Sequence, residues 1–199
     1  MPPHHIHQAL AQIEELRKAI LGNARFTGFS GWARITGGLL CPLAAFLFQS
    51  SAFPKSPTAQ AFGWGGVCLL AIAINAGALA WWFLFDPASG RDVRKLVPAA
   101  DFLAPVLVGG VLSLSLILHS AHDLLFGVWM CMYGLVNLVS RRSVPKAMIF
   151  VGCFYLCAGA DCLLLPGVRI GNPWPMALVF LLGEIAGGVI LIIDKGKRL

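Results

Sequence analysis

The last apolar run of the chain, Met176 to Ile193, is long enough to cross a lipid bilayer as a single helix. At about 1.5 Å of rise per residue, the run reaches roughly 27 Å, close to the thickness of the hydrocarbon layer. One carboxylate, Glu184, lies near its middle, and the basic segment Asp194 to Arg198 follows it. The same order, an apolar run and then a basic cluster, recurs along the chain. The sequence therefore predicts a helical membrane protein.

The composition supports this prediction. Hydrophobic residues make up 58% of the chain, charged residues only 12%, and the mean hydropathy is +0.78, whereas about a quarter of the residues in a soluble domain are charged. The formal net charge is +6, but the basic residues lie between apolar runs. That placement suits membrane lipids and their headgroups as partners, and we expect no nucleic-acid partner.

The apolar runs predict an all-α, polytopic membrane protein with six transmembrane helices arranged as three hairpins, preceded by an amphipathic helix. The connection at Ser120 and Ala121 is so short that the helices on either side of it must be antiparallel neighbours. Residues 1–28 would form a tail with the amphipathic helix, and residues 29–199 the membrane domain. The expected spans are about 32–53, 61–85, 102–118, 122–139, 147–165 and 176–193.

Lysine and arginine fall on one side of this arrangement. With six spans, every basic residue except Lys55 and Arg169 lies on the same side as both chain ends. Because basic residues are enriched in cytoplasmic loops, both termini are expected in the cytoplasm.

The N-terminal segment has an apolar stripe at helical spacing. Its members are Ile6, Leu10, Ile13, Leu16 and Ile20, and the steps of three and four place them on one helix face. The stripe could lie on the membrane, pack under the bundle or pair with a partner helix. Docking on protein is favoured because the stripe carries two acids and has no aromatic residue before Phe26. A homo-oligomer or a larger membrane complex would follow.

Two polar residues are expected near the middle of the membrane. Glu184 and Asn75 each lie ten residues from the inner ends of their helices, at Asp194 and Phe85. A neutral Glu184 bonded to the Asn75 amide would satisfy both groups without a buried charge. Such a pair could fix packing or could form a proton or substrate site, because ionisable groups within spans are often functional. Arg34 could be a third member of this layer, but it lies near the cytoplasmic end of the first span, and an extension to the headgroups is favoured.

A second polar cluster is expected at the outer side. It consists of His119, His122, Asp123 and Asp161. Imidazoles and carboxylates together could bind a divalent metal or respond to protons. The alternative is that these residues cap helix ends, as Asp123 would do at the start of a helix. This alternative is favoured, so no metal site is assigned.

Several glycines in the spans predict close helix contacts, since small residues let backbones approach each other in lipid. They are Gly77, Gly134, Gly183 and Gly187.

Sequence motifs for catalysis are not found. The chain contains no G-x-S-x-G, Walker or H-E-x-x-H motif. No histidine lies deep in a span, which argues against a transmembrane haem. We therefore expect no enzyme and no cofactor.

The patterning resembles one known family. Segments such as TGGLLCPLAAFLF and GWGGVCLLAIAINAGALAWW, in three expected hairpins, resemble the HdeD-like bacterial acid-resistance membrane proteins. Arg25 to Trp32 also resembles the RFxxxSGW start of uncharacterised bacterial six-span proteins. Neither resemblance supplies catalytic residues. What they imply is a small protein of the bacterial inner membrane, linked to stress.

Two functions follow as hypotheses. The first is a structural or interaction protein, either stress-associated or an accessory subunit of a membrane complex. The alternative is a small proton-coupled transporter or channel that uses Glu184 and Asn75.

Overall fold

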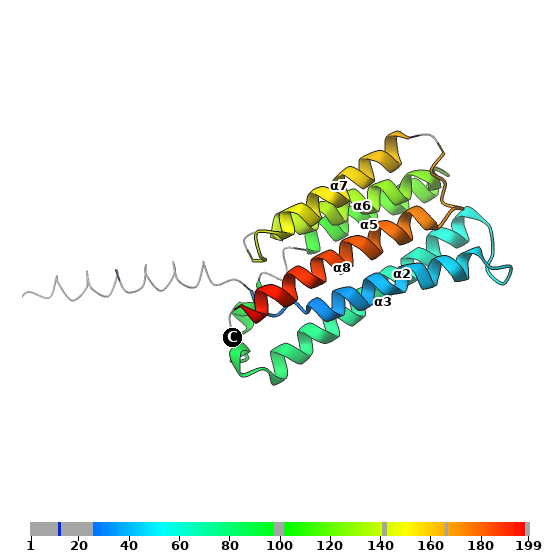
Figure 1. Ribbon diagram of the computed structural model, residues 1–199. Helices are drawn as coiled ribbons and strands as arrows, with labels where there is room; N and C mark the ends of the chain where they lie inside the picture. Colours follow the sequence, from blue (N-terminus) through cyan, green and yellow to red (C-terminus); the bar gives the residue numbers. More distant parts are fainter. Residues whose placement is uncertain (1–11, 13–25, 98–101, 141–142, 166, 198–199) are drawn as a thin grey trace, which may run out of the picture.

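The computed structural model describes residue 12 and residues 26–97, 102–140, 143–165 and 167–197. In these parts the chain is helical, and Figure 1 shows its long helices running side by side as one bundle. The α-helices are α2 (Gly31–Gln49), α3 (Pro57–Phe85), α5 (Leu103–Leu118), α6 (Leu125–Val139), α7 (Met148–Leu164) and α8 (Trp174–Gly196). Three short 3-10 helices accompany them: η1 (Pro87–Ser89), η2 (Val93–Leu96) and η3 (His122–Leu124).

Four segments are long and apolar enough to cross a membrane: Gly31–Gln49, Pro57–Phe85, His122–Val139 and Trp174–Gly196. The other two apolar helices, α5 and α7, are shorter, with 16 and 17 residues. Helices occur at all six predicted spans, and four of them have the length and hydropathy of a membrane span. The number of crossings stays a prediction.

Local sequence explains where two of the helices differ from the expected spans. α3 begins at Pro57 rather than near residue 61, because proline suits the first turn and the Ser56 side chain accepts a hydrogen bond from Ala59 N. α2 ends at Gln49 rather than near residue 53. There the Lys55 ammonium donates to the carbonyl oxygens of Phe48 and Ser50, which the helix end leaves without partners.

The closest helix packing does not follow the expected hairpins. The most extensive contacts join α6 to α7 and α2 to α8. α3 packs on α2 and α5 packs on α6, so both lie outside a four-helix core formed by α2, α6, α7 and α8. Most of α3 is exposed. In α5, the other outer helix, Gly109 is the single buried residue.

Glycine pairs explain why two helix pairs pack so closely. A Cβ on Gly127 would lie 2.8 Å from the carbonyl oxygen of Gly159, and one on Gly134 would lie 2.9 Å from that of Gly152. The two glycines of each pair therefore face each other across the antiparallel α6–α7 contact. In α2 and α8, Gly188 similarly lies against Gly31, with 2.6 Å from its Cβ position to the Gly31 carbonyl oxygen.

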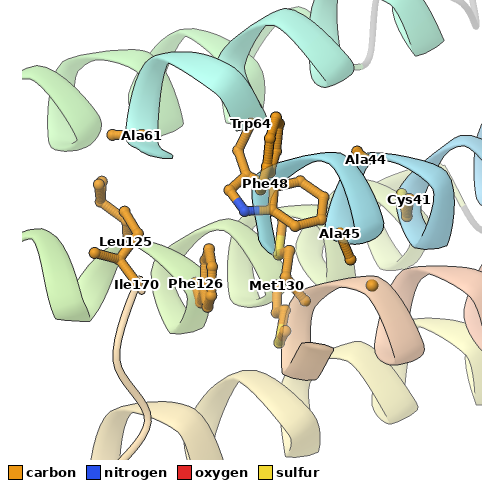
Figure 2. Close-up of a cluster of buried hydrophobic side chains, with 12 residues drawn as sticks. Cys41, Ala44, Ala45, Phe48, Ala61, Trp64, Leu125, Phe126, Met130 and Ile170 are labelled. Carbon is orange, nitrogen blue, oxygen red and sulfur yellow. The ribbon is translucent and has the colours of Figure 1, made fainter. Parts of the chain in front are cut away.

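One apolar cluster fills the end of the bundle opposite the start of α2. Figure 2 shows Phe48, Trp64, Leu125, Phe126 and Met130 pointing toward one another from α2, α3 and α6. Leu125, Phe126 and Met130 are fully buried. A second cluster of Val144, Met148, Val151 and Tyr155 lies around α7. Beside this second cluster, charged side chains enter the core.

Candidate functional site

Arg34 lies in the first turn of α2 and points into the core. The Ser30 side chain accepts a hydrogen bond from Ala33 N and so begins the helix. Gly31 lies against Gly188 and Ile192 of α8. The start of α2 therefore lies about one to two turns before the end of α8, which is Gly196. As a result, the fourth residue of α2 already lies deep in the bundle.

Arg34 forms a buried ion pair with Glu184 of α8. Arg34 Nη2 donates to Glu184 Oε1 at 2.7 Å, and Arg34 Nε donates to Oε2 at 3.0 Å. The two side chains are only 13% and 7% exposed. Two parallel bonds between a guanidinium and a carboxylate fix both distance and orientation, so this geometry is among the stronger polar contacts in proteins.

Two glycines make room for this pair. A Cβ on Gly187 of α8 would lie 2.8 Å from Arg34 Cζ, and a Cβ on Gly38 of α2 would lie 2.6 Å from the Cβ of Glu184. Each charged side chain thus lies against a glycine of the helix that carries its partner.

Residues of α6 complete the bonding of the guanidinium. Arg34 Nη1 donates to Asn137 Oδ1 at 3.1 Å, and Nη2 also approaches the Tyr133 hydroxyl at 3.4 Å. The Asn137 amide is oriented by its own bond to the Tyr133 carbonyl oxygen at 2.9 Å. Arg34 Cζ is 5.8 Å from the centre of the Tyr133 ring, within the range of a cation–π contact.

Tyr155 of α7 bonds the carboxylate. Its hydroxyl donates to Glu184 Oε1 at 3.1 Å, and its ring packs edge-on to Tyr133 with centroids 4.9 Å apart. Gly183 makes room for the Tyr155 ring. The chain has only two tyrosines, and both lie here. We call Arg34, Glu184, Tyr133, Asn137 and Tyr155 the charged centre.

The charged centre is neutral overall and its polar atoms are well satisfied. One positive and one negative charge face each other, and the remaining bonds of both come from side chains of α6 and α7. A buried ion pair withstands the loss of solvation only when its geometry is good and its other bonds are made. Side chains from all four core helices meet these conditions together, so the charged centre links those helices through side-chain hydrogen bonds.

No protein-family model, curated protein or solved structure matches this chain. The resemblance to HdeD-like proteins therefore stays a prediction, and the site has to be interpreted from its own chemistry.

The predicted partner of Glu184, Asn75, bonds elsewhere. Its amide donates to the Ala71 carbonyl oxygen within α3, at 2.9 Å. Arg34, a possible third member in the sequence prediction although the headgroups were favoured, bonds Glu184. Residue counts from the helix ends predicted that Glu184 and Asn75 lie at one depth in the membrane. These counts took no account of the offset between α2 and α8, which brings Arg34 to Glu184. The sequence signal for the Arg34–Glu184 pair was that each of these opposite charges lies within an apolar run.

Three of the four predicted packing glycines lie at helix contacts, and one does not. Gly134, Gly183 and Gly187 lie against other helices, as described above. Gly77 lies on the exposed side of α3, and no described residue comes within 4 Å of its Cβ position.

The outer polar residues lie near helix ends and bond separately. His122 Nε2 is 3.3 Å from the Thr58 hydroxyl, and His119 Nδ1 is 2.8 Å from the Ser115 carbonyl oxygen. Asp123 Oδ1 accepts from Ile170 N at 2.9 Å, and Asp161 is exposed on α7. Within the described residues, no three His, Cys, Asp or Glu side chains are grouped as metal ligands.

The predicted docking stripe of Ile6, Leu10, Ile13, Leu16 and Ile20 lies outside the described residues. Its partner surface therefore stays a prediction from the sequence.

Proposed function

We propose that this protein is a structural or interaction component of a membrane, an accessory subunit whose rigid helical bundle presents an N-terminal docking helix. The observation that carries the proposal is the charged centre, in which a buried ion pair has its bonds made by four helices. Such a network stabilises one arrangement of helices and leaves few groups free for chemistry.

The apolar helices are compatible with a membrane protein. Within the proposal, the chain crosses a bacterial inner membrane six times, with both termini in the cytoplasm. The segregation of lysine and arginine supports this orientation. The resemblance to HdeD-like proteins supports a link to stress.

The docking stripe supplies the contact to a second copy or to a larger complex. Its apolar spacing without early aromatic residues supports protein rather than lipid as the surface it binds. A bundle held rigid by its charged centre would be a fixed platform for such a contact.

The experiment compares assembly of variants after mild detergent extraction from membranes. Ile13→Ser combined with Leu16→Ser removes two members of the stripe and should shift the protein to a smaller species on native gels. Arg17→Ser combined with Lys18→Ser changes the opposite face and should leave the assembly unchanged. The same species in all three proteins would contradict the proposal.

A second candidate is a small proton-coupled transporter or channel. The specific observation in its favour is that Glu184 and the hydroxyls of Tyr155 and Tyr133 lie in one hydrogen-bonded network around Arg34. Carboxylates and hydroxyls of this kind carry protons in membrane transport proteins.

This candidate is tested by proton flux into liposomes under a pH gradient. Glu184→Gln should abolish flux that the wild-type protein supports, while Asp161→Asn on the exposed side of α7 should not. Wild-type liposomes that are no more permeable to protons than empty ones would exclude it.

A further inference from the structure

The segment just before α2 crosses one end of the bundle without forming a helix. Residues 26–30, which we call the aromatic strap, lead into the first turn of α2, which begins at Gly31. They lie at the end where α2 begins and α8 ends, which Figure 1 shows together. This end also bears the basic residues Lys195 and Lys197, and we call it the basic end.

The rings of the strap form a continuous row with rings from two outer helices. Phe26 packs edge-on to Trp82 of α3 at 5.3 Å and to Phe29 at 4.6 Å between centroids. Phe29 lies 5.1 Å from Phe102, at the start of α5. Trp82 belongs to α3 and Phe102 directly precedes α5, so this row of rings links the two outer helices across the basic end.

Gly28 shows how tightly the strap is seated. A Cβ at this position would lie 2.8 Å from Trp82 Cε3 and 2.9 Å from Leu79 Cδ1. Within the described part of the chain, the backbone bond that joins the strap to another loop runs from Phe26 N to Ser143 O, at 3.0 Å. The strap is therefore held mainly by ring contacts, and each aromatic pair contributes to stability beyond the area that it buries.

The strap leads directly to the charged centre. Phe29 packs against the apolar cluster of Val144, Met148, Val151 and Tyr155, and the Tyr155 hydroxyl bonds Glu184. Arg34 N donates to the carbonyl oxygen of Ser30, so the last strap residue forms part of the turn that carries Arg34.

We propose that the aromatic strap is a releasable cover that keeps water from the basic end out of the charged centre. Held in place, it keeps the Arg34–Glu184 pair dry. Released, it lets water from the basic end reach the charged centre and frees the first turn of α2. The cover would act in the same way under either candidate function, because it concerns access to the charged centre and not what that centre does.

The test measures how fast a water-soluble maleimide reaches a thiol placed against the apolar cluster on which Phe29 packs. Ile190 of α8 packs against the same cluster as Phe29, so Ile190→Cys, in a chain whose six cysteines are replaced by serine or alanine, reports access. The full-length protein is kept in membrane vesicles that expose the basic end, and labelling of residue 190 is followed by mass spectrometry.

Removing the rings should open the cover. Phe26→Ala combined with Phe29→Ala should raise the labelling rate at least tenfold. The matched control, Trp81→Ala, changes an exposed ring next to Trp82 and should leave the rate unchanged. An unchanged rate in a folded double variant would overturn the proposal.

A crosslink tests the cover without relying on loss of packing. Phe26→Cys and Ser143→Cys replace residues whose backbones are already hydrogen-bonded. Labelling of residue 190 should be at least tenfold slower in the oxidised form than in the reduced form of this variant. Equal rates in the two forms would overturn the proposal even if the double alanine variant failed to fold.

Discussion

Arg34 of α2 and Glu184 of α8 face each other across the core, and each lies against a glycine of the other's helix. The pair is 150 residues apart in the sequence, so it joins the beginning of the bundle to its end. Glycine opposite each charge brings the backbones close enough for the two parallel bonds. The ion pair and the close helix contact therefore depend on each other.

The Tyr155 hydroxyl should contribute more to stability than that of Tyr133. Tyr155 donates to the carboxylate at 3.1 Å, whereas Tyr133 is 3.4 Å from the guanidinium. Tyr155→Phe should lower the free energy of unfolding by about 1.5–3 kcal/mol, the range for a bond to a charged group. Tyr133→Phe should cost less, and thermal unfolding of both variants in one detergent makes the comparison. Equal losses would mean that the two hydroxyls play the same part.

The glycine pair between α6 and α7 should tolerate no side chain. Gly134→Ala places a methyl group 2.9 Å from the Gly152 carbonyl oxygen, and such overpacking costs about 1–3 kcal/mol. Gly110→Ala is the control, since no described residue approaches its Cβ position within 4 Å. It should stabilise α5 by about 0.5–1 kcal/mol, because alanine favours a helix over glycine. Equal melting temperatures for the two variants would contradict the packing described here.

Asp123 should matter as a hydrogen-bond acceptor rather than as a metal ligand. Its carboxylate bonds Ile170 N at the loop before α8. Asp123→Ala should destabilise the protein by about 1–2 kcal/mol, while Asp123→Asn keeps an acceptor and should cost less. Melting temperatures with and without a chelator complete the experiment. A chelator effect on the wild type that Asp123→Ala abolishes would indicate a metal site instead.

Much of the fold follows from the sequence because the residues of each segment alone decide whether it prefers lipid or water. The apolar runs alone located the helices, and the short link at Ser120 and Ala121 predicted adjacent helices that the structure shows as α5 and α6. Four helices have the length of a membrane span. The preference for α2–α8 and α6–α7 contacts could not be derived in this way, since it depends on which glycines face each other across helices.

The charged centre could be predicted only in part. Glu184 was identified from its place in an apolar run. Asn75 was predicted as its partner and Arg34 only as a possible third member, because residue counts from helix ends assume that all helices begin at one level. Arg34 lies in the first turn of α2 and is still buried, because that helix begins about one to two turns before the end of α8. The two tyrosines were a further signal, since a buried hydroxyl needs a partner.

The central claim is that Arg34 and Glu184 stabilise the bundle as a pair, and a double-mutant cycle tests it most directly. Glu184→Gln and Arg34→Met should each lower the free energy of unfolding by about 3–5 kcal/mol, because each leaves a buried partner unpaired. As a distant control, the change in the free energy of unfolding for Glu184→Gln combined with Gly110→Ala should equal the sum of the two single changes. The double variant Arg34→Met with Glu184→Gln should lose at least about 2 kcal/mol less than the sum of the single losses. Losses that simply add would contradict the account.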